Sequence, residues 1–305
     1  MIKPEKCFCD LEYRALDNLQ DVDVAVFSAC HGTPYKPGTA SHAANAPKAI
    51  RHALSWYSSN PEQLDLDTMK PVFGEKTVVD CGDINGSTTD GAANRQAINQ
   101  TTENILLTDS IPILIGGDDS TPIPFIEAIA SQMPVVIIQI DAHIDWREKV
   151  SGERFGFSST MRRSSEFKNV QKIIQIGGRG PGSAKPTDLA AAEAWGVKFF
   201  FARDVYKDGL TTVIDAIPQG ANVILAIDVD GLEPSVVPGV ILPAFGGLSY
   251  AHVREIILSV MERANIVGAD FVELVPERDP TNLGAMAVAR LICMTIASSG
   301  KIPST

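Results

Sequence analysis

Two groups of acidic residues, one of them with a histidine, stand directly after two apolar and β-branched stretches of the sequence. The stretches cover residues 135–140 and 223–227. The residues that follow them are Asp141, His143, Asp145, Asp228 and Asp230. Apolar runs of this length are typical of buried strands in a parallel sheet, and alternate residues of an extended chain point to the same side. Because carboxylates packed this densely repel one another unless cations lie among them, we expect a metal site with more than one ion.

The chemistry that such a site can perform is hydrolysis. A ligand set rich in oxygen, with one imidazole, suits Mn²⁺ and can also hold Ni²⁺. Two ions about 3.5 Å apart would bind one water between them and turn it into hydroxide, which attacks an electrophilic carbon. Glu273 stands at the end of the last predicted strand. Its carboxylate could bind a cationic group such as a guanidinium through charge-assisted hydrogen bonds.

Single residues are interpreted more conservatively than the combination. An aspartate at a strand end is more often a cap or turn former than a ligand, so the metal hypothesis depends on the two acidic groups together. Arg162 and Arg163 are interpreted as a solvated pair, and Cys7 and Cys9 lack the second pair of ligands that a zinc site needs. The isolated histidines are interpreted as surface or packing residues: His31, His42, His52 and His252.

Strand-like and helix-like segments alternate along the whole chain. Strands are expected at 23–27, 77–80, 112–115, 135–140, 172–176, 197–201, 223–227 and 266–273. Helices are expected at 46–54, 94–107, 122–131, 189–195, 249–262 and 284–296. This order predicts one α/β domain over residues 1–305, with a mainly parallel sheet covered on both faces. Ligands bind such sheets outside the carboxyl ends of the strands, where the turns 118–119, 141–145 and 228–230 could meet.

The composition excludes several classes of partner. The chain has 305 residues, 45% of them hydrophobic, and a net charge of −11. A strongly acidic chain without a long basic run argues against nucleic acid or a membrane surface, and no apolar run is long enough to span a bilayer. No signal peptide is evident, and the odd number of cysteines, five, is typical of reduced thiols. We therefore expect a cytoplasmic protein.

These motifs resemble those of the ureohydrolase family, which includes arginase, agmatinase and guanidinobutyrase. The family's Asp-Ala-His-x-Asp is intact at 141–145, its Asp-x-Asp at 228–230 and its Gly-Gly-Leu-Ser at 246–249, and Glu273 matches its substrate-binding glutamate. The resemblance covers about residues 24–296. It implies a three-layer α/β/α, arginase-like fold, two divalent ions (Mn²⁺ or Ni²⁺), hydrolysis of a guanidino C–N bond, and trimers or hexamers.

The sequence departs from the family's pattern at three important places. Asp119 stands where the family has a histidine ligand, and Ser158-Ser159 where it has a histidine that assists proton transfer. Leu242 lies in Val-Ile-Leu-Pro (240–243), where the family has a polar Thr-Gly-Thr-Pro loop. The resemblance then implies six ligands: Asp119, Asp141, His143, Asp145, Asp228 and Asp230. It also implies a substrate pocket that includes Ser158, Leu242 and Glu273 and that takes apolar substituents.

Three functional hypotheses follow. In the first, the chain is an active hydrolase of a guanidine, alkylated guanidine, biguanide or agmatine-like compound, with Asp145 and Glu273 as catalytic groups. In the second, it is a degenerate subunit that pairs with a paralogous partner, an arrangement similar to that of the metformin hydrolases. In the third, it is a deacetylase, which would need one Zn²⁺ and a pair of histidines that this chain does not supply. The intact acidic motifs favour the first hypothesis.

Overall fold

The apolar stretches of the sequence form the strands of a parallel sheet in the computed structural model, which describes residues 1–54, 60 and 62–300. Within these residues the sheet has nine strands, and all neighbouring strands in it run parallel. Their spatial order is β1 (Glu12–Tyr13), β5 (Val78–Ile84), β2 (Val24–Ala29), β6 (Ile111–Gly116), β11 (Asn265–Val272), β10 (Asn222–Asp228), β7 (Val135–Ile140), β8 (Val170–Ile176) and β9 (Lys198–Phe200). Two further strands, β3 (Leu64–Asp65) and β4 (Lys70–Pro71), form a separate antiparallel pair.

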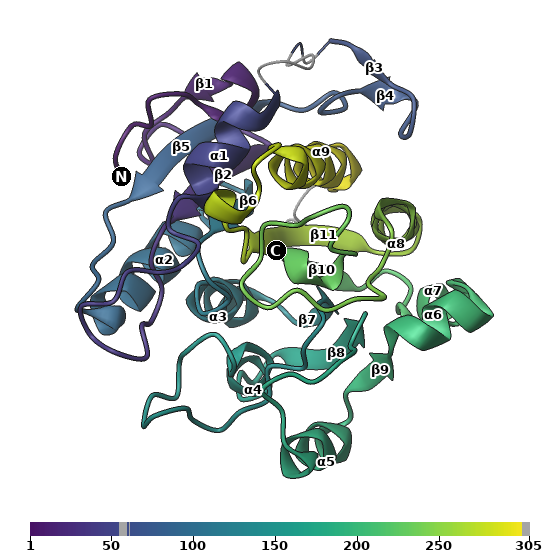
Figure 1. Ribbon diagram of the computed structural model, residues 1–305. Coiled ribbons are helices and arrows are strands. Elements are labelled where there is room, and N and C mark those ends of the chain that lie inside the picture. Colours follow the sequence, from purple (N-terminus) through teal and green to yellow (C-terminus); the bar gives the residue numbers. More distant parts are fainter. Residues whose placement is uncertain (55–59, 61, 301–305) are drawn as a thin grey trace.

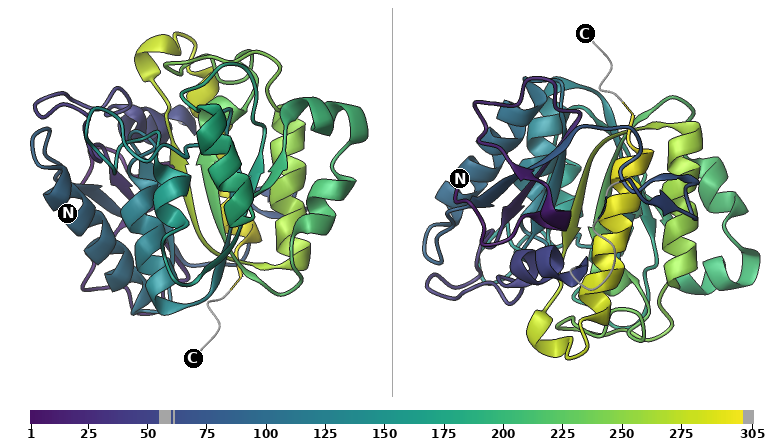
Figure 2. Two further views of the ribbon diagram at one scale, coloured as in Figure 1. Left: turned by 90° about the horizontal axis from the view of Figure 1, so that it is seen from below. Right: turned by 90° about the horizontal axis from the view of Figure 1, so that it is seen from above.

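Helices cover both faces of the sheet (Figure 1). One face packs against α1 (Ala46–Ala53), α6 (Ala202–Asp208), α7 (Thr211–Ala216), α8 (Tyr250–Arg263) and α9 (Leu283–Ser298). The other packs against α2 (Gly91–Leu106), α3 (Pro122–Gln132), α4 (Thr160–Ser164) and α5 (Pro186–Trp195). Figure 2 shows the two layers from opposite sides, with α5 in front in the left view and α9 in front in the right view. The predicted three-layer α/β/α fold is confirmed.

Burial on both faces explains why the central strands are so apolar. All six residues of β7 are buried, and in β10 only the first residue is not. A strand covered on both faces has no solvent side, so its sequence runs apolar instead of alternating with polar residues. Gln139 and Gln175 are two of the exceptions, and they face each other in the register of β7 and β8.

The strands and helices predicted from the sequence are confirmed, and three short helices were missed. Each of the eight strands and six helices expected from the sequence has a counterpart whose ends differ by a few residues. The helices α4, α6 and α7 have only five to seven residues, too few to show a helical hydrophobic period. In the part of the chain that the structure describes, no helix combines the length and apolar character needed to cross a membrane.

Candidate metal centre

Four neighbouring strands in the middle of the sheet position the candidate site. The strands β6, β11, β10 and β7 lie side by side, and the chain carries acidic residues just past the carboxyl end of each. These side chains line a cavity of about 40 Å³. Its lining consists of Asp119, His143, Asp145, Phe157, Ser158, Ser183, Asp228, Asp230, Ile241, Leu242 and Glu273. The turns 118–119, 141–145 and 228–230 therefore meet, as predicted for the crevice of an α/β sheet.

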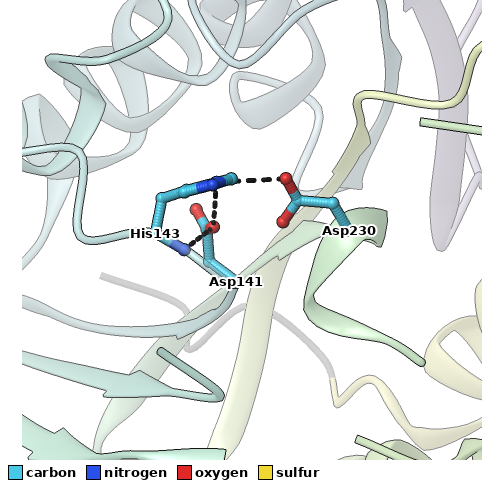
Figure 3. Close-up of side chains that lie close together, drawn as sticks. All are labelled: Asp141, His143 and Asp230. Atoms are coloured by element: carbon cyan, nitrogen blue, oxygen red, sulfur yellow. Dashed lines mark hydrogen bonds and ion pairs between the residues drawn. The ribbon is translucent and has the colours of Figure 1, made fainter. Parts of the chain in front are cut away.

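Two overlapping groups of side chains could each hold a metal ion. Asp141, His143 and Asp230 form the first group, here called the imidazole half, and Figure 3 shows them converging. Asp119, Asp141 and Asp145 form the second group, here called the carboxylate half. Within each group the donor atoms lie within 4.8 Å of one another, and Asp141 belongs to both. A carboxylate shared by two donor groups is the arrangement that can bridge two ions.

In the imidazole half, His143 neutralises part of the acidic charge. Its Nδ1 lies 3.1 Å from Oδ2 of Asp230 and 3.5 Å from Oδ1 of Asp141. Although burial opposes the charged form, the hydrogen bond and charge of Asp230 raise the pKa of His143 to about 9. Burial likewise acts to raise the pKa of Asp230, but His143 outweighs it and the pKa of Asp230 is lowered. These two residues form an internal ion pair.

In the carboxylate half, Asp119 and Asp145 form no ion pair with a cationic side chain among the residues that the structure describes. Among the described residues, no hydrogen-bond partner reaches Oδ2 of Asp119, although this residue is only 4% exposed. Burial and the neighbouring carboxylates raise the pKa values of Asp119 and Asp141 well above their usual range, and burial also raises the pKa of Asp145. A buried carboxylate oxygen without a donor carries a large desolvation cost, which a bound cation would remove.

Two buried glutamines form a chain of hydrogen bonds that ends on the carboxylates of the site. The side-chain amide of Gln139 donates to Oδ2 of Asp141 at 2.6 Å and to Oδ2 of Asp145 at 3.1 Å. The amide of Gln175 in turn donates to Oε1 of Gln139 and to the carbonyl of Ile144. Such outer contacts orient the groups that hold a metal. The sequence interpretation did not single out either glutamine, although a polar residue inside each apolar strand was the available signal.

The acidic side chains converge through turns and not through strand alternation, which corrects the geometric argument made from the sequence. Asp230 lies in a 3₁₀ turn, Val229–Gly231, and its N–H donates to Oδ1 of Asp228. A Cβ on Gly231 would lie 2.7 Å from the backbone nitrogen of Asp141, so only glycine lets this turn pack against the end of β7. Asp145 has a left-handed φ of 44°, a strained conformation that is concentrated at functional sites.

Asp228 lines the same cavity but belongs to neither donor group. Burial and the charges of Asp230, Glu273 and Asp119 raise its pKa well above the usual range. Of the six predicted ligands, the structure therefore places five in the two donor groups and the sixth beside them. Their assignment as ligands stays a prediction.

Glu273 faces this cavity from the end of β11. Its backbone has a left-handed φ of 71°, and its Oε1 accepts a hydrogen bond from the N–H of Asp119 at 2.8 Å. Its Oε2 lies 2.5 Å from Nε2 of His42. His42, which was interpreted as a surface or packing residue, therefore also contacts the carboxylate that faces the cavity. His42 and Glu273 are 231 residues apart in the chain, and nothing in the local sequence of His42 showed that the fold brings them together.

Other predicted pocket residues have mixed outcomes. Ser158 and Leu242 line the cavity, whereas Ser159 is fully buried and does not belong to the lining. Arg163 is only 1% exposed and pairs with Glu148 and Glu166, so its interpretation as part of a solvated pair was wrong. Of the two serines that the resemblance aligns with the family's His-Gly, only Ser158 faces the cavity.

The donor set fits a hard or borderline divalent ion. Oxygen atoms dominate both halves, a single imidazole nitrogen is present, and Asp119 offers a buried oxygen that no described donor satisfies. Carboxylate-rich sites with imidazole suit Mn²⁺ and also accept Ni²⁺. The residues present therefore fit one or two divalent ions, and the identity of the metal stays a prediction.

The fold and this acidic cavity define a class of protein, a parallel α/β protein with a candidate metal centre at the carboxyl ends of its central strands. Residues 22–297 match the model of the arginase family. The chain belongs to the arginase family. The resemblance to ureohydrolases drawn from the sequence is thereby confirmed.

Two curated relatives indicate the chemistry of the family. The mitochondrial guanidino acid hydrolase of Homo sapiens is 26% identical over 284 residues, which are 89% of this chain and 78% of that protein. The N(1)-aminopropylagmatine ureohydrolase of Thermococcus kodakarensis is 30% identical over 277 residues, or 88% of this chain and 90% of that protein. Both relatives are named as hydrolases. At these identities the chain is a divergent member of its family.

Solved structures agree with this assignment. The structure of proclavaminate amidino hydrolase from Streptomyces clavuligerus has a TM-score of 0.85 and 26% sequence identity, and covers 97% of each chain. The crystal structure of an agmatine ureohydrolase from Thermoplasma volcanium has a TM-score of 0.77 at 23% identity, which supports the fold alone.

Proposed function

We propose that this protein is a metal-dependent hydrolase that cleaves a C–N bond of a small guanidino compound. The observation that carries the proposal is the geometry of the two donor groups, which share Asp141 and open on the same cavity as Glu273. A cation-binding carboxylate next to a pair of metal sites is suited to hold a guanidino group over an activated water.

Each residue has a specific task in this proposal. Asp119, Asp141 and Asp145 would hold one ion, and Asp141, His143 and Asp230 the other, with Asp228 beside them. When bound, two divalent ions lower the pKa of a water enough to give hydroxide near neutral pH. Glu273 would orient the guanidino group by accepting its N–H bonds. Asp145, whose pKa is raised by burial, would take the proton that the attacking water loses.

The lining of the cavity favours a substrate with apolar substituents. Ile241 and Leu242 border the cavity, and Phe157 adds an aromatic ring to it. These residues offer no partner for an amino-acid head group. A guanidine, an alkylated guanidine or a biguanide therefore suits the site better than a substrate with an amino-acid head group does.

The proposal includes the oligomeric state and the cellular location of the enzyme. We infer a homo-trimer, a homo-hexamer or a hetero-oligomer with a paralogous subunit, on the strength of the family resemblance. A cytoplasmic location is inferred from the sequence and its cysteines.

Metal analysis combined with a product screen tests the proposal. The purified chain, loaded with Mn²⁺ or with Ni²⁺, is expected to bind two ions and to release urea or an amine from at least one guanidino compound. Fewer than one ion per chain, together with no release from any compound, would contradict it.

A second candidate function is that of a non-catalytic subunit. The observation that favours it is the position expected for the proton-transfer histidine, where Ser158 faces the cavity. Co-expression with a paralogous ureohydrolase distinguishes the two functions. A non-catalytic subunit is expected to co-purify with the paralogue and raise its activity, and to bind fewer than two ions.

A further inference from the structure

His42 makes the contact with Glu273 that the proposed hydrolysis does not use. It lies in the loop between β2 and α1, and its Nε2 is 2.5 Å from Oε2 of Glu273. Its ring meets that of Phe157 nearly at right angles, with 5.4 Å between the centroids. Glu273 and Phe157 line the small cavity, and His42 packs against both of them. The imidazole is thus held in one orientation behind the carboxylate that faces the substrate.

The charges around His42 favour its protonated form. Burial acts to lower its pKa, but the hydrogen bond and charge of Glu273, with a smaller contribution from Asp118, outweigh burial. Arg278, the charged group from the turn after β11, opposes them. In balance the pKa of His42 is raised, which favours an imidazolium beside Glu273.

We propose that a proton on His42 and a guanidinium group compete for the carboxylate of Glu273, so that binding of the guanidinium expels the proton. The inference rests on the proposed function, because it takes Glu273 as the residue that binds the guanidino group. An imidazolium already neutralises the carboxylate and repels a second cation nearby. Neutral His42 still donates Nε2–H to Oε2, while Nδ1 gives its proton to solvent and the carboxylate keeps its charge for the guanidinium.

Calorimetry measures the expelled proton directly. Guanidinium chloride is titrated into the metal-loaded, full-length protein at pH 6.5, in buffers that differ in ionisation enthalpy. Because the contact with Glu273 raises the pKa of His42 and a bound guanidinium would remove that effect, the wild type is expected to release protons as guanidinium binds. The dissociation constant of guanidinium is expected to decrease as the pH rises, by at most about tenfold per pH unit, until His42 is neutral.

Substitution of the imidazole separates this competition from other proton exchanges at the site. His42→Asn keeps a side-chain donor but does not titrate, and it is expected to bind guanidinium with almost no proton release. If this variant does not fold, His42→Gln and the pH dependence of the wild-type dissociation constant give the same test. His252→Asn is the matched control, since His252 caps α8, and it is expected to release as many protons as the wild type.

Three outcomes would overturn the inference: no guanidinium binding by the wild type, binding without proton release, or equal release from His42→Asn. The outcome for the proposed hydrolysis is separate. Proton-linked binding without turnover would leave the inference standing and remove the hydrolase function. Turnover without proton release on binding would support the hydrolase function and overturn the inference about His42.

Discussion

The imidazole half and the carboxylate half of the candidate centre differ in how they balance charge. In the imidazole half, His143 and Asp230 form an ion pair, and the backbone N–H of Ala142 adds a hydrogen bond to Asp230. Among the described residues of the carboxylate half, Asp119 and Asp145 form no ion pair with a cationic side chain, and Oδ2 of Asp119 has no donor. The imidazole half balances part of its charge with its own residues, whereas the carboxylate half needs an added cation to do so.

This difference indicates what each half requires of a metal. An ion entering the imidazole half has to displace the proton on His143, whose pKa is about 9. An ion entering the carboxylate half breaks no ion pair seen at Asp119 or Asp145 among the described residues, and it relieves the repulsion that helps to raise the pKa values of Asp119 and Asp141. The carboxylate half should therefore bind the first ion at neutral pH, and substitutions there should have the larger effects.

Loss of Asp145 is expected to have the largest effect. Asp145→Ala removes one of the three donors of the carboxylate half and the proposed proton acceptor. Residues that only support a ligand contribute about 10–100-fold in metal affinity, so the loss of a direct donor should exceed that range. Elemental analysis after gel filtration is expected to find little retained metal. Asp215→Ala, a surface aspartate that is 69% exposed, should retain as much as the wild type. Full metal content in Asp145→Ala would show that the ligand assignment is wrong.

Asp119 tests whether the carboxylate half depends on charge or on geometry. Asp119→Asn keeps the shape but removes the charge, so it is expected to weaken the first ion and to stabilise the metal-free protein against unfolding. Asp119→His replaces a carboxylate by an imidazole, which should shift the preference from Mn²⁺ towards Ni²⁺. Competition between the two metals, followed by elemental analysis, measures the shift. An unchanged ratio in Asp119→His would place Asp119 outside the metal site.

Gln139 should have an intermediate effect, because it acts on both halves through Asp141 and on one through Asp145. Gln139→Leu removes the amide that donates to both carboxylates but keeps most of the buried volume. We expect metal affinity to fall by about tenfold to a hundredfold, as is usual for an outer contact of a metal ligand. Isothermal titration with Mn²⁺ measures this change, with Gln132→Leu, at the exposed end of α3, as the control. Equal affinities would limit Gln139 to a packing role.

The sequence predicted the fold and the acidic part of the site because both depend on local patterns. Apolar runs such as 135–140 and 223–227 indicated the strands, and the acidic turns after them indicated the edge where they meet. His42, Gln139 and Gln175 were missed because their roles depend on contacts between distant segments. His42 and Glu273, for example, are 231 residues apart in the chain. The strained backbone at Asp145 was also beyond the reach of local patterns, since turn conformation is set by packing around it.

The smallest expected effect is a pH dependence of the metal-free protein. Asp119, Asp141 and Asp228 have raised pKa values in the folded protein, so the unfolded chain releases their protons at a lower pH, near about 4. Their contribution to the stability of the metal-free protein is therefore fully present below about pH 4 and is lost as the pH rises towards the folded pKa values. His143 acts in the same direction, because its stabilisation is present below about 6.5 and is lost as the pH rises through about 9.

Thermal unfolding in a chelating buffer measures this dependence. The melting temperature of the metal-free protein is expected to fall between pH 5 and pH 8, and Mn²⁺ is expected to raise it more at pH 8 than at pH 5. At a free Mn²⁺ concentration one hundred times its dissociation constant, one bound ion adds about 2.7 kcal/mol to the free energy of unfolding. Asp119→Asn should flatten the metal-free profile more than Asp230→Asn does, because the pKa of Asp230 is lowered and not raised. Equal slopes of melting temperature against pH in the two variants would show that the two halves do not differ in how they balance charge.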